Sequence, residues 1–273
     1  MVLTGDSLAI KKPNEAEKNR LRSLMGLYLP PILPFVIFLA AWWGISFLGI
    51  PKYILPSPGQ VLQELINPKW RWFPQILTTT QEVMGGFFLA VVVGILLGLV
   101  VSWSDTLSRT LMPIILFFNS MPKVAAAPLV LVWFGFGVLP NIVMSFVISF
   151  FPVLLNTARG VSEVPYEMIE LALTFNTPKW KRFVMIHIPY ALPYIMTGVK
   201  LASIMAVTGA IVGEFIASEK GLAALILQAQ SYLETGAMVG ALLWISIMAM
   251  VLFGLINLAE QLLMPWAKIK ENR

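Results

Sequence analysis

The stretch 83-VMGGFFLAVVVGILLGLVVSW-103 carries no charged residue along its whole length. An α-helix rises about 1.5 Å per residue, so about 20 apolar residues are enough to cross the ~30 Å hydrocarbon core of a bilayer. The stretch meets this length and therefore predicts a transmembrane helix.

Five further apolar runs reach a comparable length. They lie at 28–49, 110–134, 139–158, 190–216 and 237–264. Hydrophobic residues make up 58% of the 273-residue chain and charged residues only 12%, which is more apolar surface than a soluble domain of this length can bury. We therefore predict an all-α, polytopic membrane protein with six transmembrane helices, in which residues 28–264 form the membrane domain.

The distribution of basic residues predicts how the spans are oriented. Of the 19 Lys and Arg residues, Lys123 and Lys200 lie inside predicted spans. With the N-terminus inside, thirteen of the others fall in cytoplasmic segments, and the four external ones are Lys52, Lys69, Arg71 and Lys220. Cytoplasmic loops carry an excess of Lys and Arg. We therefore expect the tails 1–27 and 265–273 to face the cytoplasm.

Two external segments have patterns of their own. In the loop 50–82, the stretch Leu55-Pro56-Ser57-Pro58-Gly59 predicts an extended, turn-forming segment, because Pro fixes its own φ and restricts the residue before it. In the segment 217–236, an apolar run follows Gly221 but is too short to span a bilayer. It predicts a helix lying at the membrane interface.

Small residues recur at four-residue spacing inside the predicted spans, where they let helix backbones approach closely. They are Ala90, Gly94 and Gly98, then Gly209 and Gly213, then Gly236 and Gly240. Two interpretations stay open: ordinary packing between helices of one chain, or the seam of a dimer.

A polar segment, 163-EVPYEMIELALTFNTPKWKRFVMIHIPYALP-193, separates the predicted fourth and fifth spans. Pro165 suits the first turn of a helix, and Asn176 ends that helix because Asn tolerates the left-handed conformation. Thr177 is placed to cap a second helix that begins at Pro178. The sequence thus predicts two short helices joined by a tight turn. A plain connection is usually shorter and less patterned, so we interpret this helix–turn–helix as a docking surface.

The same segment resembles the cytoplasmic EAA loop of permease subunits in binding-protein-dependent ABC importers, whose pattern is EAA-x3-G-x9-I-x-LP. The residues that match are Glu170, Ala172, Ile186 and Pro189, and those that depart from it are Leu171, Asn176 and Ile188. Asn in place of Gly is tolerable because both accept a positive φ. Four other stretches resemble the taurine, aliphatic sulfonate and nitrate branch: Leu55–Pro58, 120-SMPKVAAAPLVLVWFGFG-137, 149-SFFPVLLNTARG-160, and Gly213-Glu214 with Gly221-Leu222.

This resemblance implies a type I importer subunit of a prokaryotic inner membrane that works as a pair, a homodimer by expectation. The loop 159–189 is expected to seat in a cytoplasmic P-loop ATPase, with Glu170 and Ala172 at the contact, Asn176 as the turn residue and Pro189 closing the motif. An external binding protein is expected to deliver the substrate. The chain contains no G-x-x-x-x-G-K-[ST] loop, so ATP and Mg²⁺ are expected on the partner ATPase, and this chain itself is expected to be no enzyme.

Few charged residues fall within the predicted spans. Lys123 lies about halfway along the third span, where it either lines the translocation pathway and favours anions, or snorkels or binds a helix carbonyl. Glu214 either helps to gate the external opening or lies in interfacial water. Lys200 is expected to snorkel toward the cytoplasmic face, and Glu260 to reach the cytoplasmic interface. His187 is the only histidine, and we expect a packing or surface role for it.

The sequence offers no catalytic, cofactor-binding or metal-binding cluster. A self-contained, ion-coupled secondary transporter is the alternative to the importer subunit, but the predicted spans lack the central acids of a proton relay. The substrate stays open among taurine, sulfonates, nitrate, bicarbonate and pyrimidine-type vitamin precursors, with Lys123 as a reason to favour anions.

Overall fold

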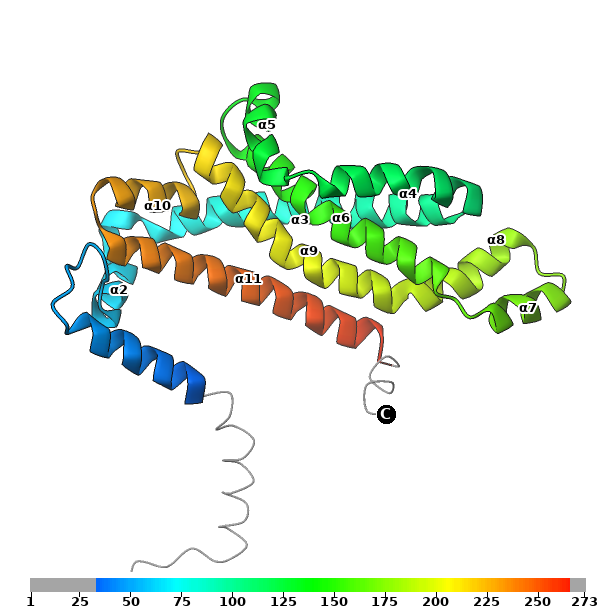
Figure 1. Cartoon of the computed structure of the whole chain (residues 1–273), viewed down its shortest axis with the longest axis horizontal. Coiled ribbons are helices and arrows are strands. Elements are labelled where there is room, and N and C mark those ends of the chain that lie inside the picture. The colour runs from blue at the N-terminus through cyan, green and yellow to red at the C-terminus, as the bar shows by residue number, and fades with distance from the viewer. Residues whose placement is uncertain (1–32, 266–273) are drawn as a thin grey trace, which may run out of the picture. The chain divides into compact units, whose positions relative to one another are not determined.

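The computed structural model describes residues 33–265, and every regular element in that range is helical (Figure 1). Four segments are long and apolar enough to cross a membrane: α3 (Trp72–Ser102), α6 (Val138–Ser162), the continuous segment Lys179–Ala217, and α11 (Thr235–Leu263). The bent pair α4 (Asp105–Ser120) and α5 (Ala127–Phe134) is a fifth candidate. The predicted all-α class is confirmed, with four or five candidate spans in the described part of the chain.

The chain divides into two units, one ending at Gln60 and the other beginning at Val61. The first contains an apolar helix, Leu33–Ser46, which lies inside the predicted span 28–49. Residues 28–32 of that span lie outside the described residues, as do the tail 1–27 and residues 266–273. The predicted span 28–49 is therefore neither confirmed nor contradicted and stays a prediction.

Helix α2 (Pro58–Leu65) begins with a capping box. The backbone N–H of Gln60 donates to Ser57 Oγ at 3.4 Å, and the backbone N–H of Ser57 donates to Gln60 Oε1 at 3.0 Å. The extended segment predicted for 55–59 thus ends at Ser57. Pro58 begins the helix instead, because its fixed φ suits the first helical position.

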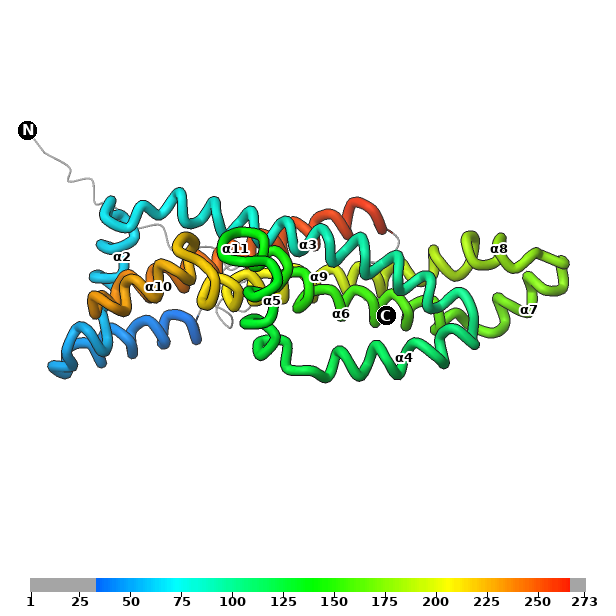
Figure 2. Tube along the Cα trace, turned by 90° about the horizontal axis from the view of Figure 1, so that it is seen from above, coloured from blue at the N-terminus to red at the C-terminus, as the bar shows by residue number. Residues whose placement is uncertain are grey.

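The core of the second unit is built by α3, α6 and α9 (Ile188–Ala217), which run side by side (Figures 1 and 2). Glycine allows the close approach. A Cβ built on Gly209 of α9 would lie 2.6 Å from the Cα of Ser145 in α6, and one on Gly98 of α3 would lie 2.6 Å from the Cβ of Thr157 in α6. These small residues therefore pack within the chain, which supports the first of the two interpretations.

The predicted third span, 110–134, is wrong as a single helix. Helix α4 begins earlier, at Asp105, and ends at Ser120, and the 3-10 turn Lys123–Ala126 then leads into α5. The two parts meet at 81°. The break lies at Met121 and Pro122, both extended (ψ 138° and 96°), because a proline pushes the residue before it out of the helical region.

The second helix of the predicted helix–turn–helix is not a separate short element. Helix α7 (Tyr166–Thr174) is followed by a turn and by α8 (Lys179–Arg182), and α8 continues through the π-helical turn Phe183–His187 into α9. Pro178 takes the cap position that was predicted for Thr177. The second helix fuses with the span because no residue between Lys179 and Ala217 leaves the helical region. The prolines at 189 and 193 are accommodated without a break.

Helix α10 (Leu222–Ser231) and the α7–α8 region lie at opposite ends of the second unit (Figures 1 and 2). The sequence predicts an interfacial helix here, yet α10 has a deeply buried face. Leu222, Leu225 and Ala229 pack with Ala237 of α11 and Trp70 of the turn before α3. Helix α10 is therefore an integral part of the fold.

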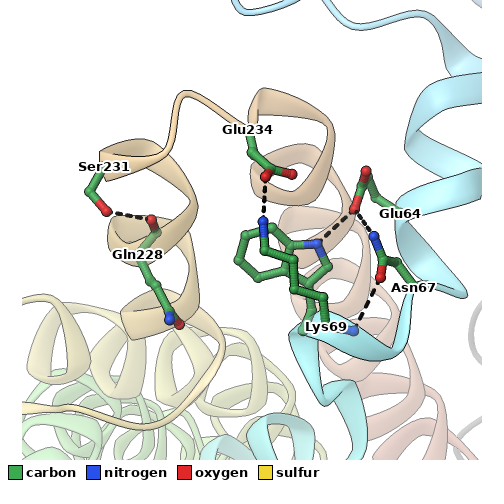
Figure 3. Close-up of polar contacts among 7 residues, drawn as sticks. Glu64, Asn67, Lys69, Gln228, Ser231 and Glu234 are labelled. Carbon is green, nitrogen blue, oxygen red and sulfur yellow. Dashed lines mark hydrogen bonds and ion pairs between the residues drawn. The ribbon is translucent and has the colours of Figure 1, made fainter.

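A polar cluster ties the start of α3 to the α10–α11 turn (Figure 3). Lys69 forms an ion pair with Glu234, and its backbone N–H donates to Asn67 Oδ1 at 3.1 Å. Glu64 Oε2 accepts hydrogen bonds from Trp70 Nε1 at 2.7 Å and Asn67 Nδ2 at 3.0 Å. The ion pair joins positions 165 apart in sequence, and the other bonds hold the segment that carries Lys69 in shape.

Candidate functional site

The α7–α8 region presents a mixed polar and apolar surface, which we call the hairpin surface (residues 166–182). Glu167 and Glu170 of α7 are exposed, whereas Ala172 on the same helix is buried. Apolar side chains on the same segment are also exposed, among them Met168 and Phe175, the latter to 75%. Exposed apolar side chains next to acids are typical of a surface that meets another macromolecule.

The turn between the two helices is a Schellman motif centred on Asn176. Asn176 has φ 51°, the left-handed conformation that its residue type predicts. The backbone N–H of Thr177 donates to the carbonyl of Ala172 at 3.0 Å, and that of Asn176 donates to the carbonyl of Leu173 at 2.8 Å. These bonds satisfy the last carbonyls of α7 and fix the direction in which the chain leaves it.

The basic half of the hairpin surface is α8, with Lys179 and Lys181 exposed and Arg182 half-buried. The Nζ of Lys179 lies 5.7 Å from the ring centroid of Trp103 at the end of α3. Trp103 in turn packs edge-on against Phe183, with ring centroids 4.8 Å apart. The base of the hairpin is thereby anchored to α3.

His187 and Pro189 lie where α8 passes into α9. The Nδ1 of His187 is 3.1 Å from the carbonyl oxygen of Val161, near the end of α6, and its ring stacks on Phe183. Pro189 is the second residue of α9. The structure thus places Glu170, Ala172 and Asn176 on one hairpin and Pro189 at its membrane-side base, in a region where His187 links α9 to α6.

Lys123 lies at the bend between α4 and α5 and is half-buried. Its Nζ donates to the backbone carbonyl of Asn119 at 2.8 Å and to Asn119 Oδ1 at 3.1 Å, and it lies 4.9 Å from the ring centroid of Phe151. The carbonyl contact is the one that the sequence offered as an alternative to pore lining. The break after Ser120 exposes this carbonyl to the ammonium group.

Lys200 and Glu260 form an ion pair between α9 and α11, with both side chains about one-fifth exposed. The sequence predicts that Lys200 snorkels toward the cytoplasmic face and that Glu260 reaches the cytoplasmic interface. The structure adds that each neutralises the other, and pairing lowers the cost of a charge within a membrane domain.

Glu214 is completely buried at the end of α9. Its Oε1 accepts a hydrogen bond from Thr79 Oγ1, and its Oε2 accepts one from the backbone N–H of Ala223 at 2.6 Å. Interfacial water is therefore not its environment. Glu214 and Lys123, the two predicted pathway residues, bind different partners and form no hydrogen bond or ion pair with each other.

Sequence reasoning missed Glu82, which it assigned to the external loop 50–82. The structure places Glu82 inside α3, completely buried beside Glu214. Its Oε1 accepts a hydrogen bond from Asn141 Nδ2 of α6 at 2.8 Å. The polar run TTTQE at 78–82 hid it, because Thr79 and Glu82 of this run are buried and bind partners far away in sequence rather than solvent.

Comparison with known proteins identifies the class to which this arrangement belongs. Residues 90–268 match the family described as binding-protein-dependent transport system inner membrane component, and the chain belongs to that family. It is therefore an integral inner-membrane protein of the ABC transporter permease class.

Individual relatives cover nearly the whole chain. The riboflavin transport system permease protein RibX of Chloroflexus aurantiacus is 33% identical over 254 residues, which cover 90% of this chain and 94% of the relative. The formylaminopyrimidine transport permease protein ThiX of Halalkalibacterium halodurans is 30% identical over 243 residues, 88% and 96% of the two chains. The taurine transport system permease protein TauC of Escherichia coli is 28% identical over 241 residues, 84% and 86%.

Proposed function

We propose that this chain forms the translocation pathway of an ABC importer and that its hairpin surface docks into a cytoplasmic ATPase. The observation that carries the proposal is the hairpin itself. Glu170 is exposed on α7, the Schellman turn at Asn176 fixes the reversal, and the basic helix α8 returns directly into the membrane segment. A membrane protein of this family has no structural need for so well-ordered a projection unless something binds it.

The connectivity supports a route by which movement of the hairpin reaches the pathway. Helix α6 ends at Ser162, four residues before α7 begins, and α8 continues into α9. Helices α6 and α9 also pack closely, with no room for a Cβ at Gly209. In this proposal, ATP and Mg²⁺ bind the partner, and closure of two ATPases draws two hairpins together. The paired helices α6 and α9 then move as one body.

The proposed assembly has two copies of this chain, two ATPases and an extracytoplasmic binding protein. The excess of basic residues near the hairpin and the tails supports a cytoplasmic position for the hairpin and both termini, and in this proposal the end with α10 meets the binding protein. Helix α4 has no buried residue, which leaves an apolar face for lipid or the second copy. Ion coupling is not needed in this scheme, because the partner ATPase supplies the energy.

The proposed substrate is a small polar solute. The relatives are named for riboflavin, formylaminopyrimidine and taurine, so the family includes permeases named for a sulfonate-bearing solute and for heterocycles. Lys123 stays our candidate for lining the pathway, with its ammonium group held by Asn119, and it would favour a sulfonate, taurine, nitrate or bicarbonate. Glu214 has no exposed surface, so we assign it to the wall of the pathway rather than to contact with the solute.

A single-cysteine cross-link tests the docking proposal, because the native chain contains no cysteine. With Glu170→Cys in the membrane, a short thiol cross-linker is expected to join this chain to a protein that mass spectrometry identifies as a P-loop ATPase. The control is Glu219→Cys, an exposed acid at the opposite end. A cross-link to the ATPase from position 219 and none from position 170 would contradict the proposal.

A further inference from the structure

Four helices meet at the buried acids Glu82 and Glu214. Glu82 belongs to α3 and Glu214 to α9, Asn141 reaches them from α6, and Ala223 lies in the first turn of α10. The two carboxyl groups are within hydrogen-bonding reach of each other. Neither side chain has any exposed surface.

Glu214 is the member of the pair that is built to carry negative charge. It accepts hydrogen bonds from Thr79 Oγ1 and from the backbone N–H groups of Ala223 and Ala224, which lie in the first turn of α10. A helix N-terminus offers unpaired N–H groups and the positive end of the helix dipole, and both stabilise a carboxylate. The hydrogen-bond donors around Glu214 therefore favour its ionised, carboxylate form.

Glu82 is incompletely satisfied as a carboxylate. Its Oε1 accepts from Asn141 Nδ2, but its Oε2 has no hydrogen-bond donor among the described residues, although it is fully buried. The Oδ1 of Asn141, independently, is also buried and without a partner. Two adjacent carboxylates cannot both stay ionised in a buried site. A proton on Glu82 Oε2 removes the repulsion and supplies a donor to Glu214.

Among the described residues, no basic side chain is paired with either acid in place of this proton. A cavity of about 520 Å³ borders Glu82, and the charged groups lining it are Glu219 and Lys220, both exposed residues of the turn between α9 and α10. The remaining neighbours from α6 and α10, Asn141 and Ala223, carry no charge. In the part of the chain that the structure describes, no Lys or Arg forms an ion pair with either acid.

The turn itself fits closely over the pair. Gly221 has φ 113°, and a Cβ there would collide with the carboxyl group of Glu214. Its N–H donates to Gln75 Oε1 at 2.7 Å, and the N–H of Leu222 donates to Thr79 Oγ1 at 2.9 Å. The α9–α10 turn is therefore held to α3 by the same residues that surround the acids.

We propose that Glu82 and Glu214 form a binding site for one proton, and that this proton fastens the α9–α10 turn to α3 and α6. Loss of the proton leaves two negative charges in contact, and the turn that covers them moves outward so that water enters from the adjoining cavity. The bound proton stabilises the packing of the α9–α10 turn at one end of the second unit. This proposal does not depend on whether the hairpin surface docks an ATPase.

The test is the pH dependence of thermal unfolding of the purified full-length chain in detergent. The folded state binds one more proton than the unfolded state above the ordinary carboxyl range, so the Tm of the wild type is expected to fall by several degrees from about pH 6 to about pH 9. In Glu82→Gln the amide replaces the proton as donor to Glu214, so most of that fall is expected to disappear. The control Glu219→Gln is expected to keep the wild-type slope.

Infrared difference spectroscopy gives a second readout. The wild type is expected to show the carbonyl band of a protonated, buried carboxylic acid, and Glu82→Gln is expected to lose it. The proposal is overturned if Glu82→Gln keeps the wild-type pH slope, if it fails to fold, or if the band is absent from the wild type. A Tm that responds to sodium at constant pH, but not to pH, would equally reject a proton as the ligand.

Discussion

Glu170→Arg is expected to weaken binding of the partner ATPase by at least about 100-fold, because placing like charges together across an interface costs several kcal/mol. Glu170 is exposed on α7 and lies in the turn before the Schellman motif, so nothing within the described chain needs its charge. The membrane fold should therefore survive the substitution. Affinity of the detergent-solubilised chain for the ATPase, together with stimulation of ATP hydrolysis, measures the effect.

The control for this change is Glu219→Arg, which reverses the same charge at the opposite end of the second unit. It is expected to leave ATPase affinity unchanged. Unaltered affinity in Glu170→Arg, with a Tm equal to that of the wild type, would show that the hairpin surface does not contribute to docking.

Gly209→Leu is expected to abolish the stable fold, and Gly209→Ala to lower stability by about 1–3 kcal/mol. A Cβ at position 209 would lie 2.6 Å from the Cα of Ser145 and 2.7 Å from the carbonyl oxygen of Met144. Both neighbours are backbone atoms of α6, so no side-chain rotation relieves the clash. Helices α6 and α9 would have to separate, and the contact through which the hairpin is proposed to act would be lost.

Gly254 in α11 provides the matched control, since no atom lies within 4 Å of a Cβ built there. Gly254→Ala is expected to leave stability unchanged, or to raise it by up to about 1 kcal/mol through better helix propensity. Thermal unfolding followed by tryptophan fluorescence compares the variants. If Gly209→Ala unfolds at the same temperature as Gly254→Ala, the close α6–α9 packing is not what holds the unit together.

The sequence was sufficient for the long helices and for the turn at Asn176. The apolar runs 83–103, 139–158, 190–216 and 237–264 lie within or nearly coincide with α3, α6, α9 and α11. Length and a scarcity of charge are local properties, and the left-handed conformation of Asn176 is likewise a property of its residue type. By contrast, the run 110–134 looks continuous, but a proline at position 122 divides it.

The buried polar contacts were beyond sequence reasoning because they join distant positions. Glu82 lies next to a polar run and so resembles a loop residue, and only the packing of α6, α9 and α10 around it reveals that it is internal. Lys200 and Glu260 are each interpretable alone as interfacial residues, yet they neutralise each other across α9 and α11. Such pairs depend on how the helices pack in three dimensions, and no local sequence pattern predicts that packing.

The central claim, that this chain is the membrane subunit of an ATP-driven importer, is tested most directly by the composition of its native complex. The chain is purified from its own membrane in mild detergent, and subunit stoichiometry is determined by mass spectrometry. We predict two copies of this chain together with two copies of a P-loop ATPase. A stable, transport-competent complex without any ATPase would contradict the claim.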